Sequence, residues 1–193
     1  LQSYNLSINQ SMEIYKQYGK DAVNIVRENP YRLAEDITGM GFKTADEIAA
    51  RLGMDKSSPY RLEAGLKYVM MSAAGEGHCY LPKEELTKKT IQLLQVGEDG
   101  LEGALTALLL RQSFHSSQSG DEVRIYYMPY HTAENNVAKA LAELSLSQRE
   151  ELSADTDSWI LRQEGIQGFN FGEKQKLAIK GAMENGTIVI TGG

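Results

Sequence analysis

The sequence contains little cysteine, little proline and no long apolar segment, and each of these absences excludes a class of protein. The single cysteine, Cys79, excludes an internal disulfide, and its Gly-His-Cys-Tyr setting offers only one other metal ligand. Four prolines in a chain that is 41% hydrophobic are typical of a folded protein rather than a disordered one. No apolar run is long enough to cross a bilayer. We therefore expect a cytoplasmic protein with no membrane partner, in which Cys79 is partly buried in a strand.

Basic residues are also few, because 20 lysines and arginines face 26 acidic residues and the net charge is −6. This balance excludes a protein that coats nucleic acid through bulk electrostatics, but it leaves room for a local phosphate site. The three histidines, His78, His115 and His131, are scattered and show no ligand or catalytic spacing. We expect no catalytic residue and no metal site in this chain.

The pattern of apolar residues, glycines and prolines predicts a mainly α-helical chain with three parts. Residues 1–56 read as short helices paired through tight turns, a tandem helix-hairpin-helix region. Residues 57–145 read as helix, short strand, helix, helix and β-hairpin, which is the order of a winged-helix-like module. Residues 146–193 read as a linker followed by the first helix and strand of a P-loop α/β motor domain. In the second part we expect strands over 78–81, 113–116 and 123–128, a polar turn over 117–121, and a helix over 132–144.

The most informative motif of the first part is Gly39-Met40-Gly41, which precedes the next helix. Two glycines around one apolar residue predict a tight turn from which free amide groups project at the start of that helix, a ready site for phosphate. Lys43 and Thr44 lie where an ammonium and a hydroxyl could add to it, and small Ala45 allows close helix packing. We predict that a DNA backbone binds at Gly39, Met40, Gly41, Lys43 and Thr44. The alternative is a plain turn between helices that needs glycine only for steric reasons.

The winged-helix pattern predicts less about binding. Its expected recognition helix, over about 99–112, is nearly all apolar, and Arg111 is its only basic residue. Reading bases needs polar side chains such as arginine, asparagine or glutamine in a groove. We therefore favour a scaffold or protein-docking role for this module.

The last residues contain the third motif. The run Thr187–Ile190 is β-branched and apolar, as in a buried strand, and Thr191-Gly192-Gly193 follows it, as at the start of a phosphate-binding loop. A glutamine that begins the preceding helix, Gln175, can pair with a donor and an acceptor on the edge of adenine. We predict nucleotide contacts at Gln175, Gly192 and Gly193, and we expect the chain to be a piece of a longer protein.

Together these segments resemble the RecD-like family of superfamily 1 DNA helicases, which is related to the exodeoxyribonuclease V alpha subunit. The resemblance covers most of the chain. It is most specific from Tyr18 to Asp46, and it extends to Gly75-Glu76-Gly77-His78 and to Gln175 with the terminal glycines. One departure is Gly172, which stands where the family usually has a residue that caps the glutamine-motif helix.

The resemblance implies a parent protein that uses ATP and magnesium to move 5′ to 3′ along single-stranded DNA in repair or recombination. It implies that this chain alone binds neither ATP nor magnesium and is inactive. Its expected partners are single-stranded or forked DNA of any sequence, the motor domains of the same protein, and other repair proteins. Two alternatives are an architectural module that docks protein without touching DNA, and the helical region of another P-loop ATPase.

Overall fold

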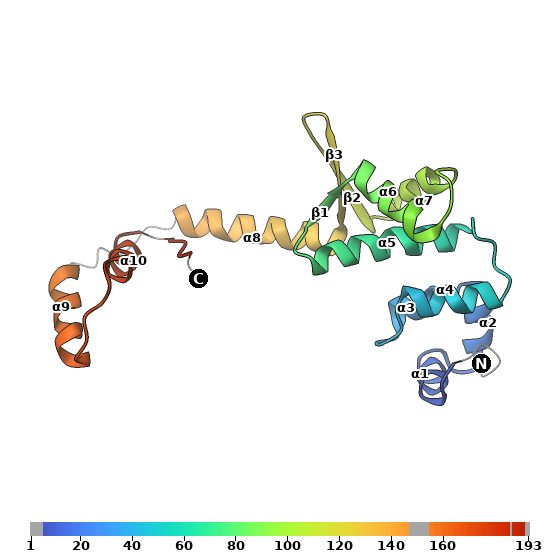
Figure 1. The fold of residues 1–193 in the computed structure, drawn as a ribbon, viewed down its shortest axis with the longest axis horizontal. Helices are drawn as coiled ribbons and strands as arrows, with labels where there is room; N and C mark the ends of the chain where they lie inside the picture. Colours follow the sequence, from blue (N-terminus) through green and yellow to red (C-terminus); the bar gives the residue numbers. More distant parts are fainter. Residues whose placement is uncertain (1–5, 147–154, 186, 192–193) are drawn as a thin grey trace. The chain divides into compact units, whose positions relative to one another are not determined.

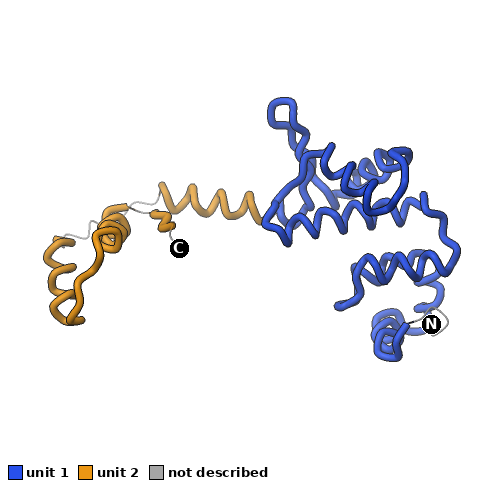
Figure 2. Tube along the Cα trace, in the orientation of Figure 1, with its two compact units in different colours: residues 1–132 blue, residues 133–193 orange. Residues whose placement is uncertain are grey.

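The computed structural model describes residues 6–146, 155–185 and 187–191, and its chain divides into two compact units, residues 1–132 and 133–193 (Figures 1 and 2). The predicted division into three parts stays a prediction. Among the described residues, no helix combines the length and the apolar character needed to cross a membrane.

The first unit begins with short helices. They are α1 (Ile8–Tyr18), the single 3-10 turn η2 (Gly19–Asp21), α2 (Ala22–Glu28), α3 (Arg32–Asp36) and α4 (Phe42–Arg51). Ser7 caps α1 through a capping box with Gln10, and Gly19, at φ +58°, ends it. The buried side chains between these helices include Ile14, Val26 and Leu33. The tandem pairing of short helices that the sequence predicts is therefore confirmed.

An α/β module completes this unit. Its elements are α5 (Pro59–Gly75), β1 (Tyr80–Pro82), α6 (Lys83–Leu94), α7 (Leu101–Leu110), β2 (Phe114–Ser119) and β3 (Glu122–Tyr127). The strands form an antiparallel sheet in the order β1-β3-β2, with Leu81 opposite Ile125 and Ser116 opposite Ile125. The buried face of α5, at Leu62, Leu66, Val69, Met70 and Ala73, is the face that its apolar spacing predicts.

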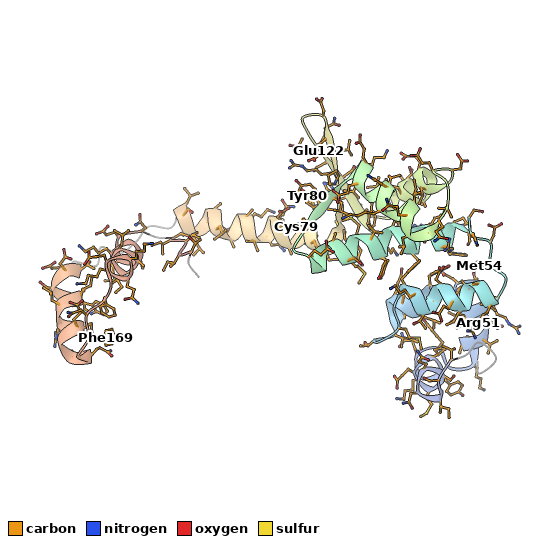
Figure 3. The ribbon with its side chains drawn as sticks, viewed as in Figure 1. Arg51, Met54, Cys79, Tyr80, Glu122 and Phe169 are labelled. Atoms are coloured by element: carbon orange, nitrogen blue, oxygen red, sulfur yellow. The ribbon has the colours of Figure 1, made fainter. Side chains whose placement is uncertain are left out.

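The strand boundaries differ from those expected. The strands β2 and β3 pair as far as Ser119 and Glu122, so the polar residues 117–119 belong to the strand rather than to the turn. These residues lie on a hairpin that is solvated on both faces, and the sequence therefore has no apolar alternation there to mark the strand. Cys79 lies just before β1 and is exposed rather than partly buried (Figure 3).

The helix α8 (Met128–Leu146) begins four residues earlier than predicted, because Pro129 fits the first turn of a helix. In the second unit, α9 (Thr156–Gln167) and α10 (Glu173–Glu184) are joined by an ion pair between Lys176 Nζ and Glu164 Oε1, 3.0 Å apart. The amide of Phe171 also donates to Glu164. The predicted strand over 187–190 is not formed, and Val189 and Ile190 are exposed. None of the described residues supplies a neighbouring strand for it.

Candidate nucleic-acid interface

The turn between α3 and α4 has the geometry that its two glycines predict. The carbonyl of Ile37 accepts a hydrogen bond from the amide of Met40 at 3.1 Å, and Gly39 between them has φ +88°. This is a left-handed conformation that residues with a side chain rarely adopt. Met40 is buried, whereas Gly39 and Gly41 are exposed. The turn therefore directs its one side chain inward and leaves its backbone open to solvent.

Gly41 is the N-cap of α4, with φ −99° and ψ 175°, and its carbonyl accepts from the amide of Ala45 at 3.2 Å. No side chain caps this helix start. The amides of the next three residues, Phe42, Lys43 and Thr44, have no acceptor in the part of the chain that the structure describes. These donors and the positive end of the helix dipole point the same way, which is a suitable arrangement for an anion.

Gly41 is not required by the fold. Its φ is one that any residue adopts, and a Cβ at this position would meet no atom within 4 Å. Gly39 also has open space around it, but its positive φ makes a side chain there strained. The absence of a side chain at Gly41 therefore keeps the approach to the α4 amides open without serving the packing of the hairpin.

The two predicted polar contributors lie beside these amides. Lys43 is exposed, and no carboxylate among the described residues lies within 4 Å of its ammonium. Thr44 is half-buried in the same first turn. The structure thus brings Gly39, Gly41 and the first turn of α4 together, with the Met40 side chain buried behind them.

The hairpin is held in place by two buried clusters. Met40 and Ile48 pack with the helices that precede them, and Phe42 and Ala45 pack against the α/β module. The ring of Phe42 stacks between those of Tyr31 and Tyr68, with ring centres 5.9 and 5.2 Å away. Because both clusters include residues of α4, the helix start is fixed relative to the whole first unit.

An ion pair that sequence reasoning missed ties α4 to α5. Arg61 donates from Nε and Nη2 to the two carboxylate oxygens of Asp46, at 2.8 and 3.0 Å. Its Nη1 donates to the carbonyl of Leu94 at the end of α6. The hydroxyl of Tyr31 donates to Asp46 Oδ1 at 2.6 Å. The Asp46 carboxylate therefore connects α4 to α5 and to Tyr31, the residue that precedes α3, and Arg61 extends this connection to the end of α6.

The electrostatics of this cluster follow from its partial burial. Burial opposes ionisation of Asp46, but the hydrogen bonds from Arg61 and Tyr31 outweigh it and lower the pKa of the carboxyl group. Burial, and then the hydrogen bond to Asp46, raises the pKa of the Tyr31 hydroxyl. Asp46 is therefore ionised and Tyr31 neutral near neutral pH. Asp46 follows Ala45 on the packed face of α4, and a carboxylate on an apolar stripe was the signal that could have revealed it.

Three basic side chains of the α/β module are paired with carboxylates. Arg111 at the end of α7 donates to Glu63, and α7 buries Leu101, Ala104, Leu105 and Leu108. On α6, Lys83 and Lys89 pair with Glu102 and Glu85 at 2.8 and 2.7 Å. This agrees with the expectation that the winged-helix-like module presents little that could read bases.

The predicted nucleotide-binding residues lie in the second unit. Gly192 and Gly193 are outside the described residues. Gln175 is exposed in the first turn of α10, and its Oε1 accepts from the amide of Gly172 at 2.9 Å. The glutamine itself thus caps the helix start for which Gly172 has no side chain. Its amide group and the second lone pair of Oε1 remain for a ligand, and its contact with adenine stays a prediction.

Comparisons with known proteins agree with the geometry of the hairpin. Residues 1–80 match the model of the ATP-dependent RecD2 DNA helicase HHH domain, where HHH denotes helix-hairpin-helix. The whole chain is similar to the ATP-dependent RecD2 DNA helicase of Deinococcus radiodurans, with 27% identity over 203 residues. The chain spans 28% of the length of that relative. These matches confirm the resemblance: the chain is similar to the N-terminal region of RecD-like DNA helicases, and its first 80 residues match their helix-hairpin-helix domain.

Proposed function

We propose that this chain is the DNA-binding and positioning region of an ATP-dependent 5′ to 3′ DNA helicase of the RecD-like family, acting in repair or recombination. Its hairpin over 39–44 holds the sugar-phosphate backbone. The observation that carries this proposal is the first turn of α4, where the amides of Phe42, Lys43 and Thr44 lack an acceptor in the described chain. The match of residues 1–80 to the helicase domain supports it.

The proposed contact is electrostatic and independent of sequence. A phosphate oxygen accepts from the α4 amides while Lys43 contributes an unpaired ammonium and Thr44 a hydroxyl. Phosphate contacts position a protein on DNA without reading bases, so the hairpin would hold any sequence. The net charge of −6 is compatible with this role, because such a site depends on a few aligned donors rather than on bulk charge.

The reaction itself would belong to the longer protein. We propose that ATP and Mg²⁺ act there, that Gln175 contacts the adenine edge, and that Gly192 and Gly193 begin the phosphate-binding loop. Bound ATP would supply the energy for movement along the strand, and Gln175 would hold its base through one donor and one acceptor. The motor domains of the same protein and other repair proteins are the proposed protein partners, and the cytoplasm is the proposed location.

A second candidate function is architectural, in which the hairpin only packs. The Asp46–Arg61 ion pair favours the architectural function, because it holds α4 against the α/β module whether or not DNA is bound. In that case the hairpin would be a rigid connector, and the amides of α4 would face solvent or a protein partner.

Fluorescence anisotropy with the 193-residue chain separates the two functions. Single-stranded, duplex and forked DNA would be titrated at several salt concentrations, with Lys43→Ala compared to Lys88→Ala, an exposed lysine on α6. We expect Lys43→Ala to weaken the affinity for all three DNA substrates by about three- to tenfold. It should also reduce the slope of log affinity against log salt concentration by about 1, while Lys88→Ala changes neither quantity. Equal, small effects of both variants would support the architectural role.

A further inference from the structure

A groove adjoins the hairpin on the side of α5. It has a volume of about 480 Å³, within the range of roughly 300–1,000 Å³ that is typical of ligand sites. The turn contributes Met40 and Gly41 to its wall, and α5 contributes Lys67, Tyr68 and Met71. Gly41 therefore belongs both to the groove and to the helix start with the unpaired amides.

The groove has a neighbouring hollow. A second hollow of about 430 Å³ is lined by Lys67 and Tyr127, which also line the first, and by Met128 and Pro129 at the start of α8. Both hollows have Lys67 and Tyr127 in their walls, and both lie within the first unit. Taken one after the other they define a track from the hairpin to the start of α8, which suits an extended polymer better than a single compact ligand.

The walls of this track are aromatic and apolar. Ala64, Lys67, Tyr68, Met71 and Ser72 recur at intervals of three and four residues, so they share one face of α5, distinct from its core face. Met71 is 55% exposed, although the core face of the same helix is buried. Tyr68 and Tyr127 are half-buried. Planar rings and a polarizable thioether are surfaces on which a nucleobase stacks regardless of its sequence.

The charges of the groove match a base rather than a phosphate. The ammonium of Lys67 lies 2.6 Å from Glu35 Oε1, so the two charges neutralise each other inside the groove. The pair still offers a donor and an acceptor to the polar edge of a base. Phosphate charge finds its donors outside the groove, at the first turn of α4. A strand bound with its phosphate at the hairpin would thus meet an apolar, nearly neutral surface next to it.

We propose that this groove binds unstacked bases of single-stranded DNA next to the phosphate that the hairpin holds. This inference rests on the proposed function and adds a preference to it, since the bases of an intact duplex are stacked on each other and do not reach the groove. The hairpin alone would bind single strands and duplexes alike. The groove makes the region favour a single strand.

The test compares the 193-residue chain with Met71→Glu, and uses Met12→Glu on α1 as the matched control. Met12 is 54% exposed, so both variants add one negative charge at equally exposed methionines. The probes are a fluorescent 15-residue oligothymidylate and a blunt duplex of equal length. We expect Met71→Glu to weaken binding of the single strand by about five- to tenfold, as for the loss of a stacked base, and to affect the duplex no more than Met12→Glu does.

Equal losses for the two probes, or equal effects of the two variants, would overturn the groove proposal. The hairpin is judged separately: loss of duplex binding in Lys43→Ala together with an unaffected Met71→Glu would sustain the proposed function and reject the groove. Retained duplex binding in Lys43→Ala, together with a selective loss of single-strand binding in Met71→Glu, would sustain the groove and reject the phosphate site at the hairpin. Failure of the single strand to bind the unchanged chain at low salt would reject both.

Photocrosslinking gives a second readout that does not depend on a variant. An oligothymidylate with one 5-iodouracil is irradiated with the chain, and the attached peptide is identified by mass spectrometry. We expect attachment at Tyr68 or Tyr127. Attachment instead at Tyr80 or Tyr126, on the opposite face of the sheet from Leu81 and Ile125, would contradict the groove proposal.

Discussion

The carboxylate of Asp46 on α4 accepts two hydrogen bonds from the guanidinium of Arg61 on α5, one from Nε and one from Nη2, with N–O distances of 2.8 and 3.0 Å. The Arg61 and Asp46 side chains are only 13% and 26% exposed, so water screens the pair little. The contact joins the helix that carries the candidate phosphate site to the longest helix of the α/β module. It sets the position of the hairpin relative to the groove.

Removing one partner of this pair should destabilise the first unit. We expect Arg61→Ala to lower the free energy of unfolding by about 1–3 kcal/mol, because Asp46 would keep a partly buried charge with one hydrogen bond fewer on each oxygen. Urea denaturation followed by circular dichroism measures this. Glu13→Ala is the control, since Glu13 pairs with Lys16 on the exposed surface of α1 and its loss should change the free energy of unfolding by less than about 0.5 kcal/mol. Equal urea midpoints for the two variants would show that the Arg61–Asp46 pair does not stabilise the first unit.

The same carboxylate predicts a dependence of stability on pH. The pKa of Asp46 is lowered in the folded chain from its ordinary value of 3.8, so the folded state binds a proton less readily than the unfolded state. The stabilisation from Asp46 is therefore complete above pH 3.8 and is lost as the pH falls through the lower, folded pKa. The difference in urea midpoint between the unchanged chain and Asp46→Asn should be constant from pH 5 to 7 and shrink below about pH 4. A constant difference down to pH 2 would contradict this assignment.

The hydrogen bond that the Tyr31 hydroxyl donates to Asp46 gives a related prediction. We expect Tyr31→Phe to cost about 1 kcal/mol, because it removes the 2.6 Å bond to Asp46 while the ring keeps its place beside Phe42. Tyr15→Phe is a matched change at an exposed tyrosine of α1 and should leave the free energy of unfolding unaltered. Thermal denaturation of both variants decides whether the hydroxyl or only the ring matters.

The helices of this chain follow from local signals in the sequence, and its long-range contacts do not. Gly19 ends α1 because glycine adopts a positive φ easily, and Pro30 and Pro59 mark helix boundaries because proline restricts φ, which is why most helix bounds agree with the structure. Asp46 and Arg61 are fifteen residues apart, and nothing in residue spacing states that their helices cross there. The groove was missed for the same reason, since it arises only where α5 passes beside the hairpin. The strand expected over 187–190 reflects composition, and composition cannot supply a neighbouring strand.

The two glycines of the hairpin should respond differently to the same substitution. We expect Gly39→Ala to destabilise the chain by about 1–2 kcal/mol, because its φ of +88° brings a Cβ close to the backbone. Gly41→Ala should leave the free energy of unfolding nearly unchanged, since φ is −99° and no atom lies within 4 Å of the added carbon.

Gly41, whose substitution should leave stability unchanged, should matter for DNA binding. The larger side chain in Gly41→Val would stand over the amides of Phe42 and Lys43. It should weaken the binding of single-stranded and duplex DNA about equally, whatever their sequence. We expect the variant to keep the fold, and a urea midpoint near that of the unchanged chain would show that any lost affinity comes from the blocked approach. Undiminished DNA binding in a folded Gly41→Val chain would mean that the α4 amides do not hold phosphate, and the hairpin would then be a packing element.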